Sequence, residues 1–203
     1  MRLFQAPVSS CARRAVMTAI HLHADVDLVE VNLMKPEDRA LLASMNPNVK
    51  VPILEDDGFV LWESHAIMQY IAERTPGQTL YPTDARARAD VNRWLFWSSQ
   101  HWGPAIGVLN FQHFIKKIIG QGDADPAEVA RGEREVTQFA TVLDRHLHDR
   151  EWISGKTLTL ADFSIAAQLM TIVPAKLPVA PYANIHVWFA RMRALPAWQK
   201  TDL

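Results

Sequence analysis

The feature that most constrains the fold of this chain is a change of hydrophobic pattern at about residue 80. Before it, short apolar runs typical of strands alternate with helical periodicity, which indicates a βαβ unit followed by a hairpin and another helix. From residue 85 onward the periodicity is helical only. The stretch TPGQTLYPTD lies between them, and its two prolines and glycine interrupt any regular pattern. We therefore predict an α/β domain over residues 1–76, a linker over 77–84 and an all-helical domain over 85–203.

The strongest local signal of the α/β part is Asp57-Gly58, which lies between two apolar runs. This pair tolerates the positive φ angles of a tight hairpin turn. Further strands are predicted at residues 2–5 and 25–31, and helices at 12–20, at 36–44 and around 67–71.

The helical part is predicted to contain a long helix over 85–120 that Gly103-Pro104 kinks or breaks, because proline removes a hydrogen bond and clashes with the preceding turn. Further helices are expected at 126–149, 160–173 and 184–195. Thr159 and Asp162 form a capping-box pattern at the start of one of them, which specifies the fold and not a reaction.

Charge and cysteine content exclude several classes of function. There are 21 basic and 22 acidic residues and no basic run, so nucleic acid is not expected as a partner. The single cysteine cannot form an internal disulfide, and we find no signal-like segment and no span apolar enough to cross a membrane. We therefore expect a cytoplasmic protein without a membrane partner.

Two histidine pairs, His21 with His23 and His146 with His148, raise the question of a metal. Residues two apart on a helix do not face the same way, and no cysteine or carboxylate completes a ligand set. We predict no metal site.

The stretch Ser9, Ser10, Cys11 precedes the first helix and allows two interpretations. A serine can cap the helix. Alternatively, a hydroxyl at a helix N-terminus can donate to a thiolate held in front of it, since the helix dipole favours negative charge there. No histidine is near in sequence to activate a serine, so a hydroxyl that donates is favoured over one that attacks.

Glu63-Ser64 and Pro52 also allow more than one interpretation. Ser64 is either a plain N-cap or, together with Glu63, a site for the carboxylate and ammonium of an α-amino acid group. The bond before Pro52 is normally trans at the head of a strand. Clustered aromatic side chains such as Trp94 and Phe96 either pack in the core or line a cleft for an apolar ligand.

These motifs, in their order and at their distances, resemble the soluble glutathione transferase family over nearly the whole chain. They are SSCARRAV, NPNVKVPIL, ESHAIMQYIAE, the proline-containing linker and TLADFS. The resemblance implies a thioredoxin-like N-terminal domain that binds glutathione, an all-helical C-terminal domain with a hydrophobic substrate pocket, a role in detoxification, and commonly a homodimer.

The resemblance also assigns residues. It makes Pro52 a cis proline, which leaves the backbone of Val51 to pair with the cysteinyl part of glutathione. It assigns Glu63 and Ser64 to the γ-glutamyl end and Lys50 to the glycyl carboxylate.

The first tyrosine is Tyr70, which excludes the tyrosine-type classes, and the register of serine-type, theta-like members makes Ser9 the catalytic hydroxyl with Ser10 second. Cys11 is expected in the first helical turn, pointing inward. Other members use a cysteine here for disulfide chemistry, so the alternatives to conjugation are a glutathione-dependent reductase, peroxidase or isomerase using Cys11, or a noncatalytic interaction protein. The substrate pocket is expected to be lined by aromatic and neighbouring residues of the helical domain: Trp97, His101, Trp102, Phe111 and Phe114.

Overall fold

The computed structural model describes residues 1–202. By their internal contacts, residues 1–83 and 194–202 form one compact unit, and residues 84–193 form a second. Residues 194–202, which the sequence analysis groups with the helical domain, therefore pack with the α/β part. Residue 203, the last of the predicted helical domain, lies outside the described residues.

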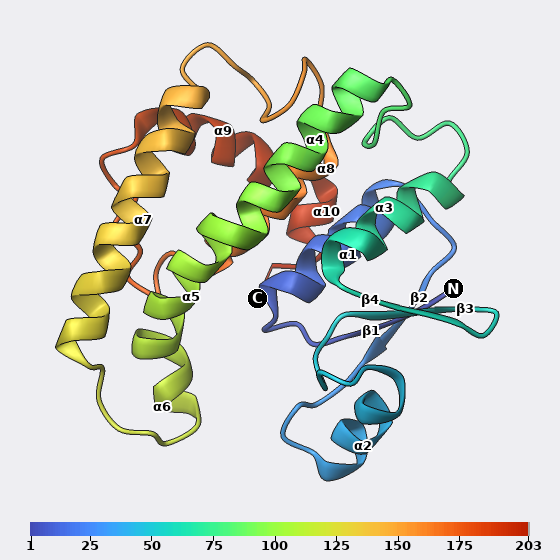
Figure 1. The fold of residues 1–203 in the computed structure, drawn as a ribbon, viewed down its shortest axis with the longest axis horizontal. Coiled ribbons are helices and arrows are strands. Elements are labelled where there is room, and N and C mark those ends of the chain that lie inside the picture. Colours follow the sequence, from blue (N-terminus) through green and yellow to red (C-terminus); the bar gives the residue numbers. More distant parts are fainter. Residues whose placement is uncertain (203) are drawn as a thin grey trace. The chain divides into compact units, whose positions relative to one another are not determined.

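The first unit is a four-stranded mixed sheet with the order β2-β1-β3-β4. β1 runs parallel to β2 and antiparallel to β3, and β3 and β4 form an antiparallel hairpin. Helices α1 and α3 lie on one side of the sheet and α2 on the other (Figure 1). This is the predicted thioredoxin-like arrangement. Its elements, in chain order, are β1 (Arg2–Gln5), α1 (Ser10–His21), β2 (Asp27–Glu30), α2 (Pro36–Met45), β3 (Ile53–Asp56), β4 (Phe59–Trp62) and α3 (Ser64–Arg74).

The hairpin turn and the first helix that the sequence predicts in this unit are both present. Asp57 and Gly58 have φ angles of 49° and 85°, which close the two-residue turn between β3 and β4. α1 packs against α3, and its residues from Ala12 to Ala19 are all buried. The short helix α10 (Pro196–Gln199), which we did not predict, packs against α1.

The second unit is helical, as predicted. Its main helices are α4 (Ala85–Trp97), α5 (Gly103–Asn110), α7 (Pro126–His146), α8 (Leu160–Gln168) and α9 (Ala183–Ala194). Shorter pieces are the π-helical turns Ser98–Trp102 and Phe111–Ile115, α6 (Lys116–Ile118) and a 3-10 turn at Leu169–Thr171. α5 packs against α7, and α4 packs against α8.

Gly103-Pro104 was predicted to kink or break the long helix, and of these two outcomes the break does not occur. The backbone stays helical through Trp102 and Gly103, and a π-helical turn precedes the proline. In that turn the Gly103 N–H donates to the Ser98 carbonyl, so the hydrogen-bond register shifts locally where proline lacks a donor. A Cβ on Gly103 would lie 3.0 Å from that carbonyl oxygen, a tight contact, so the close approach favours glycine.

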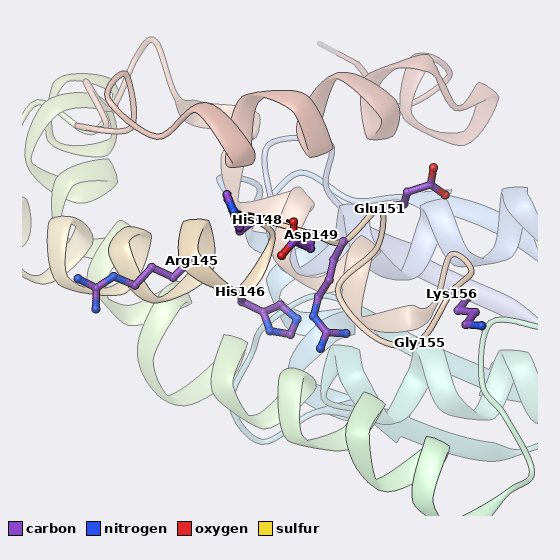
Figure 2. A pocket seen from close by; sticks show the side chains of 8 residues that line it. Arg145, His146, His148, Asp149, Glu151, Gly155 and Lys156 are labelled. Atoms are coloured by element: carbon purple, nitrogen blue, oxygen red, sulfur yellow. Dashed lines mark ion pairs between the residues drawn. The ribbon is translucent and has the colours of Figure 1, made fainter.

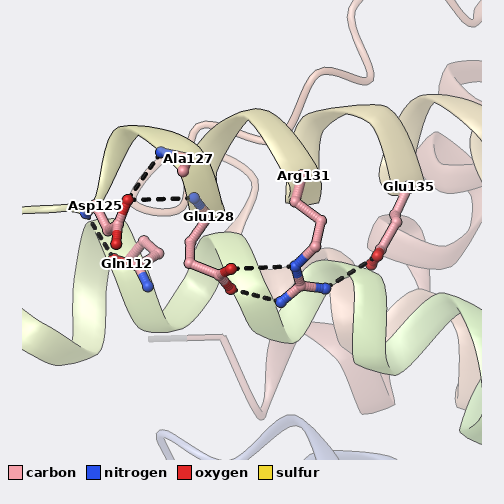
Figure 3. Close-up of polar contacts among 6 residues, drawn as sticks. All are labelled: Gln112, Asp125, Ala127, Glu128, Arg131 and Glu135. Atoms are coloured by element: carbon pink, nitrogen blue, oxygen red, sulfur yellow. Dashed lines mark hydrogen bonds and ion pairs between the residues drawn. The ribbon is translucent and has the colours of Figure 1, made fainter.

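The start of α7 is stabilised by hydrogen bonds to the side chains of Asp125 and Gln112 (Figure 3). Asp125 Oδ1 accepts from the N–H groups of Ala127 at 2.8 Å and Glu128 at 3.4 Å, and the Asp125 N–H donates to Gln112 Oε1 at 2.9 Å. Farther along, Arg131 pairs with Glu128 and Glu135. Among residues 1–202, no helix combines the length and apolar character needed to cross a membrane.

Candidate functional site

A cavity of about 240 Å³ opens in the first unit where three segments meet. They are the start of α1, the loop before β3 and the start of α3. The cavity is lined by one thiol, one cation, one carboxylate and several hydrogen-bonding groups: Cys11, Asn46, Asn48, Lys50, Val51, Pro52, Glu63 and Ser64. Six of the residues predicted from the sequence thus line one cavity, although they are up to 53 positions apart in the chain.

Ser9 caps α1. Its Oγ accepts from the Ala12 N–H at 3.2 Å, and its carbonyl accepts from the Arg13 N–H at 2.9 Å. The capping interpretation is therefore correct, but it does not exclude the other one. A hydroxyl that accepts one hydrogen bond still has a proton to donate.

Cys11 lies in the first turn of α1 and is exposed, lining the cavity. The expectation that it points inward is wrong. The inward positions of this turn are taken by Ala12, Arg13 and Arg14, which are all buried. Ser9 and Ser10 are only half-buried and flank the same helix end.

The loop before β3 contains a cis bond between Val51 and Pro52, as the family resemblance implied. Asn46 organises this loop: its Nδ2 donates to the Lys50 carbonyl at 2.9 Å, and its Oδ1 accepts from the Asn48 N–H at 2.9 Å. Val49 has a positive φ of 52°, which is unusual for a β-branched residue. Asn46 therefore holds the backbone of Lys50 at the cavity, and Lys50 itself is exposed.

Ser64 is the first residue of α3 and not its N-cap, so the plain capping interpretation is wrong. Glu63 occupies the cap position without capping through its side chain, at φ 74° and ψ 111°. Such a conformation costs free energy and persists only where the surroundings impose it. It leaves the Glu63 carboxylate exposed, while Ser64 is buried at the helix N-terminus.

Behind these residues, the side chains of Arg14 and His65 contact each other through Nη1 and Nε2. Arg14 is 2% exposed, and its burial lowers the pKa of the guanidinium. The nearby Cys11 and Glu63 act in the opposite direction and raise this pKa. Burial, followed by the Arg14 charge, holds the pKa of His65 well below its ordinary value. A permanent cation and a neutral imidazole thus lie next to the cavity.

The cavity offers chemically distinct positions. Glu63 with the N-terminus of α3 can hold the ammonium and carboxylate of an amino acid group. The Val51 backbone can pair with an extended chain, and Lys50 can pair with a second carboxylate. The N-terminus of α1 favours negative charge on a sulfur or oxygen held in front of it. The arrangement fits a short peptide with a carboxylate at each end.

The predicted substrate-pocket residues lie in the helical unit, and they differ in exposure. Trp102 is fully buried and donates from Nε1 to the Ile165 carbonyl at 3.3 Å, so it belongs to the core of this unit. Trp97 stacks on it with a centroid distance of 5.9 Å. The other three are accessible to some degree: His101 and Phe111 are exposed, and Phe114 is half-buried.

A larger cavity of about 800 Å³ lies in the helical unit, and it is lined mainly by charged side chains. Figure 2 shows that these side chains diverge, with Arg145 and Lys156 pointing to opposite sides and Glu151 away from both. His146 is engaged in the fold, since its Nε2 contacts the Ile153 carbonyl and its ring packs on Trp94. This cavity lacks a convergent set of groups.

Our sequence reasoning missed Asn46, Asn48, Arg14 and His65. The pattern Asn-Pro-Asn before Val51 signals a turn closed by an asparagine side chain, and it could have identified the first two. Arg14 and His65 carry no comparable signal, because a lone arginine in a helix is usually a surface residue.

Comparison with known proteins assigns both units to one family. Residues 1–73 match the family described as "Glutathione S-transferase, N-terminal domain", and residues 104–196 match "Glutathione S-transferase, C-terminal domain". The chain is 30% identical over 205 residues to a glutathione S-transferase of Hyoscyamus muticus, with 98% of this chain and 96% of the relative covered.

Solved structures agree. Glutathione S-transferase III in its apo form is 29% identical with a TM-score of 0.84, and the match covers 98% of this chain and 94% of the other. Glutathione S-transferase-I bound with lactoylglutathione has a TM-score of 0.85 at 23% identity, with 99% and 97% covered. At that identity the second likeness concerns the fold.

Proposed function

Because this chain belongs to the glutathione S-transferase family, with glutathione as co-substrate, we propose that it ionises the glutathione thiol and transfers the sulfur to a hydrophobic electrophile. The thiol loses its proton to solvent, and the thiolate attacks an electrophilic carbon. A carbon–sulfur bond forms, and the leaving group departs with the electron pair of the bond that breaks.

The observation that carries this proposal is the single cavity that joins Lys50, Val51, Glu63 and Ser64 to the N-terminus of α1. In our assignment, Glu63 and Ser64 hold the γ-glutamyl end, the Val51 backbone pairs with the cysteinyl residue, and Lys50 faces the glycyl carboxylate. This spacing would direct the sulfur toward the first turn of α1. Residues 1–76 would then form the glutathione-binding domain and residues 85–203 the domain that supplies the electrophile, with Trp97, His101, Phe111 and Phe114 as candidates for its pocket.

Ser9 is our candidate for the group that donates to the thiolate, which makes this a serine-type member. An ordinary thiol has a pKa of about 8.5. A hydrogen bond to a charged acceptor contributes roughly 1.5 to 3 kcal/mol and a helix N-terminus roughly 0.3 to 1 kcal/mol. At 1.36 kcal/mol per pKa unit, the two together lower the pKa by about 1.3 to 3 units, to about 5.5 to 7, which makes the thiolate a major form of the bound thiol at neutral pH.

The test is Ser9→Ala, for which we expect turnover of a generic aryl halide to fall by about one to three orders of magnitude, as for the loss of one stabilising donor. Calorimetric titration with glutathione should show binding in both proteins, because the contacts of Lys50, Val51, Glu63 and Ser64 remain. Ser10→Ala is the matched control. Undiminished turnover in Ser9→Ala together with a loss in Ser10→Ala would transfer the role to Ser10.

Cys11 supports a second candidate function, because its thiol is exposed and lines the cavity. Its thiolate would attack the sulfur of a substrate–glutathione disulfide, form a disulfide between Cys11 and glutathione, and release the reduced substrate. A second glutathione would then regenerate Cys11 and leave as glutathione disulfide. Cys11→Ala should abolish this reduction and spare aryl halide conjugation; a reduction that survives in Cys11→Ala would show that Cys11 is not its nucleophile.

A further inference from the structure

Arg13 is a buried cation one turn after Ser9, and its partners come from the far end of the chain. Its side chain is 3% exposed. Nε donates to Thr201 Oγ1 at 3.1 Å, and Nη2 donates to the Trp198 carbonyl at 3.3 Å and to Asp202 Oδ1 at 3.1 Å. The guanidinium also lies over the Trp198 ring at 3.9 Å. Three residues of segment 194–202 thus hold one side chain of α1.

Arg13 is connected directly to the helix end that forms the sulfur site. Its N–H donates to the Ser9 carbonyl at 2.9 Å, which closes the first turn, and Ser9 Oγ in turn accepts from Ala12. A buried guanidinium must keep its hydrogen-bond partners, because a buried charge without them is strongly destabilising. The side chain of Arg13 therefore cannot move without leaving segment 194–202, and the first turn of α1 is constrained with it.

We propose that segment 194–202 positions the catalytic end of α1 through Arg13, so that Arg13 is a positioning residue for the Ser9 hydroxyl. This inference rests on the proposed function, since it concerns the same bound sulfur. Arg13 acts on that sulfur only through the helix: its guanidinium contacts the segment and not the cavity, whose lining residues do not include it.

The test is the pKa of the bound glutathione thiol in Arg13→Leu, read from thiolate absorbance in the ultraviolet across pH. We expect this pKa to rise by about one unit, which lowers the thiolate fraction at pH 6.5, and kcat with it, by about twofold to eightfold. The KM for glutathione should change less than about twofold, because the residues that bind the peptide ends lie on other elements. Arg13→Lys keeps the charge but lacks the planar fork, so it should give an intermediate shift.

Tyr70→Phe is the matched control. It removes another hydrogen bond of the same unit, from Tyr70 Oη to Asp56 Oδ2 at 2.7 Å, away from α1. It should lower the melting temperature without shifting the thiol pKa. Should Arg13→Leu fail to fold, the double variant Thr201→Val with Asp202→Ala removes two hydrogen-bond acceptors of Arg13 and should shift the thiol pKa in the same direction.

The outcomes are separable. A depressed thiol pKa in the wild type that is unchanged in the Arg13 variants, or unchanged in the double variant, overturns the positioning role and leaves the proposed function intact. A bound thiol that titrates in the wild type as it does in free glutathione overturns the proposed function itself.

Discussion

Individual residues set the charge around the cavity, and the pair Arg14 and His65 is the clearest case. Arg14 is buried, and its guanidinium contacts His65 on α3. A second positive charge on the imidazole would lie against the first in a poorly solvated place. His65 is therefore held neutral, and its own protonation acts against folding.

We expect this to appear as loss of stability in acid. The pKa of His65 is lowered in the folded state, so between its folded and unfolded values the unfolded chain binds more protons. The free energy of unfolding should fall as pH drops below about 6.5, by at most about 1.4 kcal/mol per pH unit. Urea unfolding at pH 7, 6 and 5, followed by circular dichroism, measures it.

His65→Gln should flatten this dependence, while a substitution of the exposed His23 to glutamine should leave it as in the wild type. Equal slopes in the wild type and His65→Gln would show that His65 is not the group responsible.

At the scale of the element, the start of α8 depends on one carboxylate. Asp162 is fully buried, and each of its carboxylate oxygens accepts two hydrogen bonds. Oδ1 accepts from the Ile153 N–H and from Trp188 Nε1, and Oδ2 accepts from the N–H and the hydroxyl of Thr159. Burial raises its pKa to about 6, and these hydrogen bonds act against the rise.

Asp162→Asn should destabilise the helical unit by about 3 kcal/mol. The amide keeps one acceptor but presents a donor to the Thr159 N–H, which leaves a buried donor without an acceptor. The control is Asp149→Asn, because the Asp149 side chain is 91% exposed. Urea unfolding of the two variants compares them, and a similar small loss in both would contradict the role of Asp162.

The start of α7 separates the effect of a cap from that of surface ion pairs. Asp125→Ala removes the acceptor for two helix N–H groups and should cost about 1 kcal/mol. Arg131→Met removes the ion pairs to Glu128 and Glu135, which are open to solvent and screened by salt, so its effect should be smaller. Thermal unfolding at low and high salt would distinguish them; a larger loss for Arg131→Met would reverse this order.

At the scale of the whole molecule, the order of elements followed from local patterns. The hairpin at Asp57-Gly58 and the helices α1, α2 and α7 were predicted because turn residues and apolar periodicity act within a few positions. The π-helical turn at Ser98–Trp102 was not predicted, since it depends on how the helix accommodates Pro104 and on the close approach of Gln168 to Gly103. The docking of Trp198 on Arg13 was missed because the two are 185 positions apart.

The sequence by itself determined a strand-and-helix unit followed by helices, and it placed Ser9, Pro52, Glu63 and Ser64 at the ends of elements, because hydrogen-bonding and steric preferences of short segments act locally. Only the tertiary structure decided that Pro52, Glu63 and Ser64 line one cavity together with Cys11. It also decided that Arg13 contacts the segment 194–202 while Arg14 contacts His65. Those outcomes depend on which distant surfaces exclude water together, and no short stretch of the chain contains that information.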